Sequence, residues 1–337
     1  MKKVSLYFLF ALVPLALFAG GVSDKDLVNT QSVDITGIQS ISIRYGAEDV
    51  VFLVSPENKL IIKEYMTRDD KSYYASVSKS GGVLEIKEGK RPAFRNFSSK
   101  TEVYMPAAFA GSLDCTIGSG RITSEIEDMV LSNVSISGGS GTIIVRNVTG
   151  EKCSIKVGSG RISAGMIRAS TVLSTSSGDV NVDGVSGTEH SLASSSGNVS
   201  AGLVSGTRSE LKCSSGKIEV GTAIGIVNAV NSSGSITITG LQGSGNFETN
   251  SGTISIGFIE PSGDVSFAAS SGNINIAVSK NVAFTLDAET SSGTVEFVTN
   301  DGREKIKRES VLYSVGASPE FTIKARVNSG SVNVELK

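Results

Sequence analysis

The sequence predicts an all-β protein, a parallel β-helix or solenoid of about 12 coils with ~19 residues in each coil. Three observations predict this fold. A Ser-Gly-x-Ile/Val motif recurs along most of the chain, apolar and polar residues alternate on both sides of it, and no intervening stretch has helical periodicity. Stacked coils pair each strand with its copy in the next coil, so we expect a parallel sheet with right-handed crossovers.

The signature glycine of each repeat follows a serine and precedes, by two positions, an isoleucine or valine. We number positions relative to this glycine, so the serine is at −1 and the β-branched residue at +2. The signature glycines are Gly120, Gly141, Gly160, Gly178, Gly197, Gly216, Gly234, Gly252, Gly272, Gly293 and Gly330. The interval from Gly293 to Gly330 is about two periods, which predicts one coil that has lost the signature.

Alternation around the glycine predicts short strands with one buried face. Positions −7, −5 and −3 hold Leu113, Cys115 and Ile117 in the first copy, and polar residues stand between them. The β-branched bias at +2 and +4 agrees with strands. A second corner recurs near the middle of each repeat, as at Gly150 and Gly187, where we expect a positive φ.

Residues 20–106 predict irregular β coils that cap the N-terminal end of the solenoid, since an open sheet edge invites aggregation. The candidate strands are 35–43, 50–54, 60–62, 83–86 and 101–105, and the polar stretches 64–72 and 88–100 are expected to be protruding loops. The repeats occupy 107–337. A charged insertion at 301–310 is expected to fold over the other end.

The first 19 residues predict a cleavable secretory signal peptide. Lys2 and Lys3 precede an apolar run from Val4 to Phe18, and a small residue, Ala19, stands at the expected cleavage site. This run is short for a membrane span. We therefore expect an exported protein, periplasmic, secreted or on the cell surface, without an integral span in the mature chain.

Composition disfavours several functions. The formal net charge of −2 becomes about −4 when Lys2 and Lys3 are removed, so no basic surface predicts nucleic-acid binding. Tryptophan is absent and aromatic residues make up 6% of the chain, which disfavours a large aromatic cleft for stacking sugars.

No residue set predicts a catalytic, cofactor-binding or metal site, and no cofactor is expected. His190 is the only histidine, which disfavours a catalytic triad and an imidazole-rich metal site. The Gly-Ser-Gly fragments ending at Gly120 and Gly160 lack the helix that a phosphate-binding loop requires. Asp179 and Asp183 come nearest to a carboxylate pair, and a solvated corner explains both.

The −1 serines could form a ligand-binding row, but we expect their hydroxyls to satisfy backbone groups at the tight corner. Cys115, Cys153 and Cys213 fall at inward positions. Cys115 and Cys153 are two coils apart, beyond the ~7 Å reach of a disulfide. We expect three free thiols in the core.

With the repeats set out, the chain resembles the bacterial putative-adhesin family of exported β-solenoid domains of unknown function. The likeness covers about residues 32–337. It rests on the strand Thr101-Glu-Val-Tyr-Met-Pro106 before the repeats and on turns such as Ser195-Ser-Gly-Asn-Val199. The resemblance implies surface binding by analogy and assigns no site.

We therefore expect a non-catalytic cell-envelope or surface β-solenoid that acts as an adhesin-like binding or scaffold module, and not an enzyme. Its partner would be an envelope, glycan or host-surface molecule. Two alternatives remain open: a structural envelope protein that self-assembles end to end, and a polysaccharide-active β-helix enzyme. Concentration-dependent association would favour the first, and turnover of a polysaccharide would favour the second.

Overall fold

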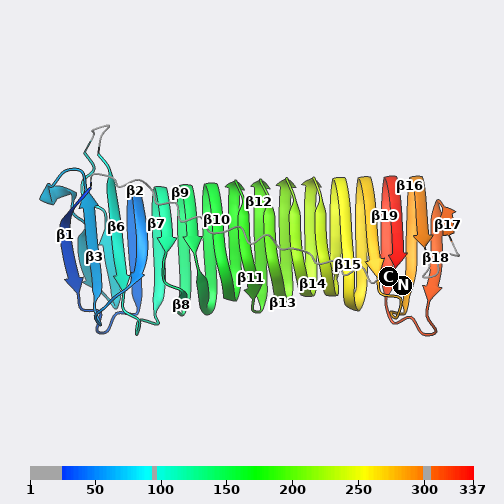
Figure 1. Cartoon of the computed structure of the whole chain (residues 1–337), viewed down its shortest axis with the longest axis horizontal. Helices are drawn as coiled ribbons and strands as arrows, with labels where there is room; N and C mark the ends of the chain where they lie inside the picture. The colour runs from blue at the N-terminus through cyan, green and yellow to red at the C-terminus, as the bar shows by residue number, and fades with distance from the viewer. Residues whose placement is uncertain (1–24, 93–96, 299–304) are drawn as a thin grey trace, which may run out of the picture.

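The computed structural model describes residues 25–92, 97–298 and 305–337, and strands stacked side by side form one long body (Figure 1). Within these residues the one helical element is a short 3-10 turn, η1 (Lys71–Tyr73). The all-β prediction is confirmed. The signal peptide expected at residues 1–19 lies outside the described residues.

The N-terminal part combines the first solenoid strand with further strands, some parallel and some antiparallel to their neighbours. Its strands are β1 (Asp26–Val33), β2 (Ser40–Val54), β3 (Leu60–Met66), β4 (Ser76–Ser80), β5 (Val83–Lys87) and β6 (Ser99–Met105). β2 pairs in parallel with the first repeat strand, whereas the pairs β1–β3, β3–β6 and β4–β5 are antiparallel. The predicted loops at 64–72 and 88–100 are each wrong at one boundary. Glu64 is a buried residue of β3, and residues 99–100 belong to β6.

The repeats form a stack of parallel strands. These are β7 (Ser112–Ser124), β8 (Asp128–Val130), β9 (Asn133–Val145), β10 (Asn147–Ser177), β11 (Val180–Ser186), β12 (Glu189–Ser196), β13 (Val199–Ser215), β14 (Ile218–Ser233) and β15 (Ile236–Val278). Their register follows the sequence columns, so Gly120 pairs with Gly141 and Gly141 with Gly160. Each residue type is therefore repeated along the stack at one position of the coil.

The signature glycines are required for two separate reasons. Their φ angles lie between 116° and 152°, a region that side chains disfavour. A Cβ on any of them would also lie 1.7–2.1 Å from a carbonyl oxygen of the neighbouring coil. The expected positive φ at the second corner is wrong for Gly150 and Gly187; at Gly150 the close approach alone excludes a side chain, because its Cβ would lie 2.1 Å from the Leu131 carbonyl oxygen.

The core is a continuous column inside the stack. The +2 residues of all eleven signature repeats are at most 1% exposed. Burying each of these side chains stabilises the fold by roughly 1.5–3 kcal/mol. Larger side chains fill the C-terminal part, where the rings of Phe247 and Phe267 stack with centroids 5.3 Å apart. The alternation therefore predicted the inward face correctly.

The C-terminal strands do not stack in chain order, and the predicted coil without a signature does not exist in the described residues. The strands are β16 (Phe284–Val298), β17 (Lys305–Arg308), β18 (Ser310–Val315) and β19 (Thr322–Leu336). β17 and β18 pair antiparallel with β16, so the long interval contains an end cap. β19 then returns and lies between β15 and β16, parallel to both (Figure 1). Residues 301–304 of the charged insertion lie outside the described residues.

Candidate functional site

An open groove of about 680 Å³ crosses the outer surface of six successive coils, from β9 to β14. We call it the hydroxyl groove. Residues at −4, −3 and −2 line it, and the −3 side chains of Thr175, Ser194 and Cys213 point into the core beneath it. The groove is open because small residues occupy the −2 position, namely Gly158, Ser176, Ser195, Ser214 and Ser232. The groove therefore follows from small residues repeated in register along the stack.

The groove presents hydroxyl groups and positive charge. Ser176, Ser195 and Ser214 are exposed at the same position of three adjacent coils, so their hydroxyls repeat at the ~4.8 Å strand spacing. Lys156 and Lys212 also line the groove, and Lys212 forms an ion pair of 2.8 Å with Glu210. All residues that line the groove are described, and none is a carboxylate or a histidine.

A buried ladder of hydrogen bonds, which sequence reasoning missed, runs beneath the groove and continues into the coils beyond it. At −3 the apolar residues of the first coils give way to polar ones, each of which donates to the signature glycine carbonyl of the neighbouring coil. The bonds are Thr175–Gly160 (3.3 Å), Ser194–Gly178 (2.8 Å), Cys213–Gly197 (3.0 Å), Asn231–Gly216 (2.8 Å), Thr249–Gly234 (3.4 Å) and Thr290–Gly330 (3.1 Å). The change from apolar to hydrogen-bonding residues in this column was the available signal.

The −1 serines do not have the role expected from the sequence. In the described chain none of their hydroxyls makes a hydrogen bond, and all eleven residues are exposed. Their backbone carbonyls instead accept hydrogen bonds from corner amides of the neighbouring coil. Ser196, for example, accepts from the Gly178 amide over 2.8 Å. The strand pairing already satisfies the corner, so a row of free hydroxyls remains beside the groove.

The other residues considered from the sequence have structural roles. His190 is buried, and its Nε2 donates to the Ser205 carbonyl over 2.9 Å; burial lowers the pKa of this histidine. Asp179 accepts from the Asn198 amide over 3.0 Å and contacts Arg161 at 3.5 Å, as a corner residue does. Gly120 and Gly160 belong to the stacked glycine column and lie within strands β7 and β10.

All three cysteines are buried and unpaired. Cys115 pairs in register with Ile136, and Cys153 pairs with Val134, so the two thiols lie in different columns as well as different coils. Burial raises the pKa of Cys153 to about 12. Cys213 differs because it is one of the residues that line the groove, although its side chain is turned inward and is 4% exposed.

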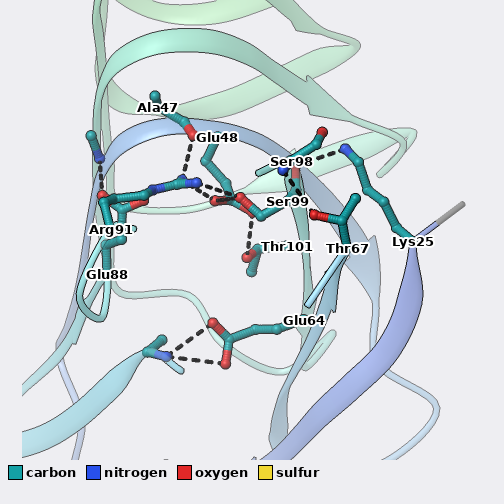
Figure 2. A network of polar contacts seen from close by, with 12 residues as sticks. Lys25, Ala47, Glu48, Glu64, Thr67, Glu88, Arg91, Ser98, Ser99 and Thr101 are labelled. Carbon is teal, nitrogen blue, oxygen red and sulfur yellow. Dashed lines mark hydrogen bonds and ion pairs between the residues drawn. The ribbon is translucent and has the colours of Figure 1, made fainter. Parts of the chain in front are cut away.

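A second polar cluster lies buried where the N-terminal strands meet the solenoid (Figure 2). Glu48 takes the register position of the signature glycine, opposite Gly120, and is 4% exposed. It accepts hydrogen bonds from Ser99 at 2.6 Å and Thr101 at 3.2 Å and forms an ion pair with Arg91. Burial nevertheless raises the pKa of Glu48 to about 7, because it outweighs the effects of these three partners.

Glu64 is a second buried carboxylate on the same side of the cap (Figure 2). It accepts from the Ala75 amide at 2.9 Å and from Asn29 at 2.7 Å, and burial raises its pKa. The space between the two carboxylates is closed to water-sized molecules. The cluster therefore joins the cap to the first coil and offers no room for a ligand. Among the described residues, no three His, Cys, Asp or Glu side chains are grouped to hold a metal.

The stacked parallel strands define a β-solenoid with an exposed hydroxyl groove. The chain belongs to the Toastrack DUF4097 family, whose model matches residues 38–224 and 190–335, and the resemblance seen in the sequence is thereby confirmed. No functionally curated protein matches the chain. No helix among the described residues has the length and apolar character needed to cross a bilayer.

Several solved structures are similar to the chain at low identity. A putative cell adhesion protein from Clostridium sporogenes is 9% identical over 93% of this chain and 100% of its own, with a TM-score of 0.20. A putative adhesin from Parabacteroides merdae is 14% identical over 71% and 95%, with a TM-score of 0.34. A putative lipid binding protein from Parabacteroides distasonis is 14% identical over 91% and 96%, with a TM-score of 0.30. These values are too low to transfer an activity to this chain.

Proposed function

We propose that this protein is a non-catalytic, exported cell-envelope or surface module that binds an extended glycan in the hydroxyl groove. The groove is the single observation that supports this function. Its hydroxyls repeat once per coil over several coils, which suits a chain of polyhydroxylated units lying along the stack. Lys156 and Lys212 favour a glycan that carries acidic groups.

The rigidity of the groove supports the same proposal. The −3 side chains buried beneath it are bonded to the neighbouring coil, so binding requires little ordering of the protein. No aromatic residue lines the groove, and stacking on sugar rings does not contribute. Affinity would therefore come from many weak hydrogen bonds, and it would increase with the length of the glycan.

The proposal includes three finer points. The solenoid is right-handed, as parallel crossovers nearly always are, and it has about twelve coils, from the eleven signature glycines and the coil of Glu48. The protein is not an enzyme, because glycosidic cleavage uses carboxylates that the groove does not present. It acts outside the cytoplasm, in the periplasm, at the cell surface or after release.

The test is binding to a panel of neutral and acidic polysaccharides by isothermal titration calorimetry. Ser195→Arg places a long side chain in the groove and is expected to weaken binding at least about tenfold, whereas Thr253→Arg, in a coil beyond the groove, should leave binding unchanged. Equal binding by both variants would reject the groove. Absence of binding to the whole panel would reject the glycan, and release of shortened products would favour the enzyme.

A self-assembling structural protein is the second candidate, and the two ends of the stack favour it. β1 pairs only with β3, and β18 pairs only with β16, so each strand has one edge without a partner in the described chain. Leu312 of β18 is 78% exposed. Exposed edge strands can pair with another chain. Filaments in sedimentation velocity that disappear in Leu312→Lys would favour this function over glycan binding.

A further inference from the structure

The last strand occupies a position between two strands that precede it in the chain. We call the space between residues 265–278 of β15 and residues 284–298 of β16 the slot. β19 fills it with inward residues matched on both sides: Val332 pairs with Ile274 and Val295, and Val334 pairs with Ile276 and Phe297. The core column therefore passes through β19 without interruption.

β19 also follows the glycine geometry of the continuous coils. A Cβ on Gly330 would lie 1.9 Å from the Gly272 carbonyl oxygen, and one on Gly293 would lie 1.8 Å from the Gly330 carbonyl oxygen. These are the close approaches found between coils that are directly connected. The slot thus has the shape of one ordinary rung of the stack.

Polar side chains on both walls of the slot bind β19. Arg326 donates to both carboxylate oxygens of Asp287, at 2.8 and 2.6 Å, and lies 3.4 Å from Glu289 on the same wall. On the opposite wall Asn275 accepts from Asn333 over 2.9 Å, and Asp264, which precedes that wall in β15, accepts from the Thr322 amide over 2.7 Å. The contacts give β19 a defined place and direction.

The connections allow β19 to leave and enter the slot as a unit. β15 runs into β16 through residues 279–283, and β19 is joined to β18 only through residues 316–321. Without β19 the facing residues of β15 and β16 match each other, because Ile274 and Val295 occupy the same column, as do Ile276 and Phe297. The two walls therefore offer the same pairing residues to β19 of their own chain and to β19 of another copy.

We propose that β19 is an exchangeable strand and that the slot also binds β19 of a second copy of this chain, which produces a strand-swapped dimer. Swapping of an identical element preserves every native contact of that element. Its free-energy cost is therefore limited to bringing two chains together and to rearranging the linker 316–321. This inference does not depend on ligand binding in the hydroxyl groove. It also differs from end-to-end assembly, because β1 and β18 take no part in it.

The test uses the full chain with Asn275→Cys and Asn333→Cys, a half-buried and an exposed residue whose side chains meet between β15 and β19. The protein is equilibrated at several concentrations, oxidised, and analysed on denaturing gels without reductant. A disulfide within one chain reports β19 in its own slot, and a disulfide-linked dimer reports exchange. We expect the ratio of dimer to monomer to rise with protein concentration, as mass action requires.

Two further measurements keep the test decisive. Arg326→Gln removes the clamp on Asp287 and is expected to speed exchange roughly fivefold, whereas Lys324→Gln, exposed on the same strand, should not change it. If the cysteine pair prevents folding, native mass spectrometry of mixed light and heavy unmodified chains replaces it, with a mixed-mass dimer as the expected product. Disulfides within one chain at every concentration, or monomers alone by mass, would overturn the proposal.

Discussion

The hydroxyl of Thr290 donates to the carbonyl oxygen of Gly330 over 3.1 Å, although forty residues separate the two along the chain. In five other coils the same bond joins partners that are 15 or 16 residues apart. Gly272 is the signature glycine that precedes Thr290 in the sequence, yet β19 lies between them. Position in the stack, and not order in the chain, therefore selects the hydrogen-bond partner.

Gly197→Ala tests the glycine column. The substitution places a Cβ 2.1 Å from the Gly178 carbonyl oxygen at a φ of 143°, so we expect the free energy of unfolding to fall by at least about 3 kcal/mol. Ser196→Ala, at the adjacent exposed position, should change it by less than about 0.5 kcal/mol. Urea unfolding followed by circular dichroism measures both. Similar losses in the two variants would show that the column tolerates a side chain.

Ser194→Ala tests the buried ladder under the groove. It removes the donor to the Gly178 carbonyl and should destabilise the protein by about 1–3 kcal/mol. Ser194→Cys provides the control, because Cys213 makes the same contact in the next coil, and it should retain most of the lost stability. If the alanine and cysteine variants unfold at the same urea concentration as the wild type, the ladder does not stabilise the fold.

Glu48 gives the cap a pH dependence of defined sign. Its pKa is raised from 4.5 to about 7 by burial, so between these values the folded protein holds a proton that the unfolded chain has released. The free energy of unfolding should therefore decrease as the pH rises from about 4.5 to 7, by roughly 3 kcal/mol from this residue. Glu64 acts in the same direction, whereas the lowered pKa of His190 reduces stability as the pH falls below 6.5.

The measurement compares the wild type with Glu48→Gln in urea at pH 5 and pH 8, and Glu57→Gln is an exposed control. Glu48→Gln should lose most of the decrease between the two pH values, and the control should retain it. A wild-type slope unchanged in Glu48→Gln would mean that Glu48 is already ionised at pH 5.

The three thiols are expected to differ in reactivity. Cys115 and Cys153 should be alkylated only after unfolding, because burial raises the pKa of both thiols and removes them from solvent. Cys213 is 4% exposed and lies just beneath the groove, so it should react first in the folded protein, and more slowly when a glycan is bound. Mass spectrometry after timed alkylation measures this order. A disulfide between any two cysteines would contradict the register of the coils.

Much of the fold could be predicted because the information is local and repeated. The residue at +2 is Ile or Val in every signature repeat, and each proves to be buried, as Ile254 is. The place of β19 could not be predicted, because Val332 and Val334 fit any rung of a stack whose rungs share one pattern. Polar contacts such as that of Arg326 with Asp287 distinguish the slot, and these two residues are 39 positions apart.

The candidate site was harder to predict than the fold. Ser176, Ser195 and Ser214 are ordinary polar residues in the sequence and form a groove only when three coils align them. Glu48 was missed because the first coil lacks the signature, although a carboxylate within an alternating strand is a signal of a buried partner such as Arg91. The role predicted for the −1 serines was wrong because strand pairing already supplies the hydrogen bonds of the backbone at the corner.

The position of β19 between β15 and β16 is the central claim about the fold, and disulfide trapping tests it most directly. Three variants place cysteines at residues 275 and 333, 296 and 333, or 275 and 296, and each is oxidised when dilute and folded. The first two should form intramolecular disulfides, because Asn333 pairs with both Asn275 and Glu296. The third should not, because its residues are two rungs apart and beyond the ~7 Å reach of a disulfide. A disulfide between residues 275 and 296 alone would contradict this arrangement.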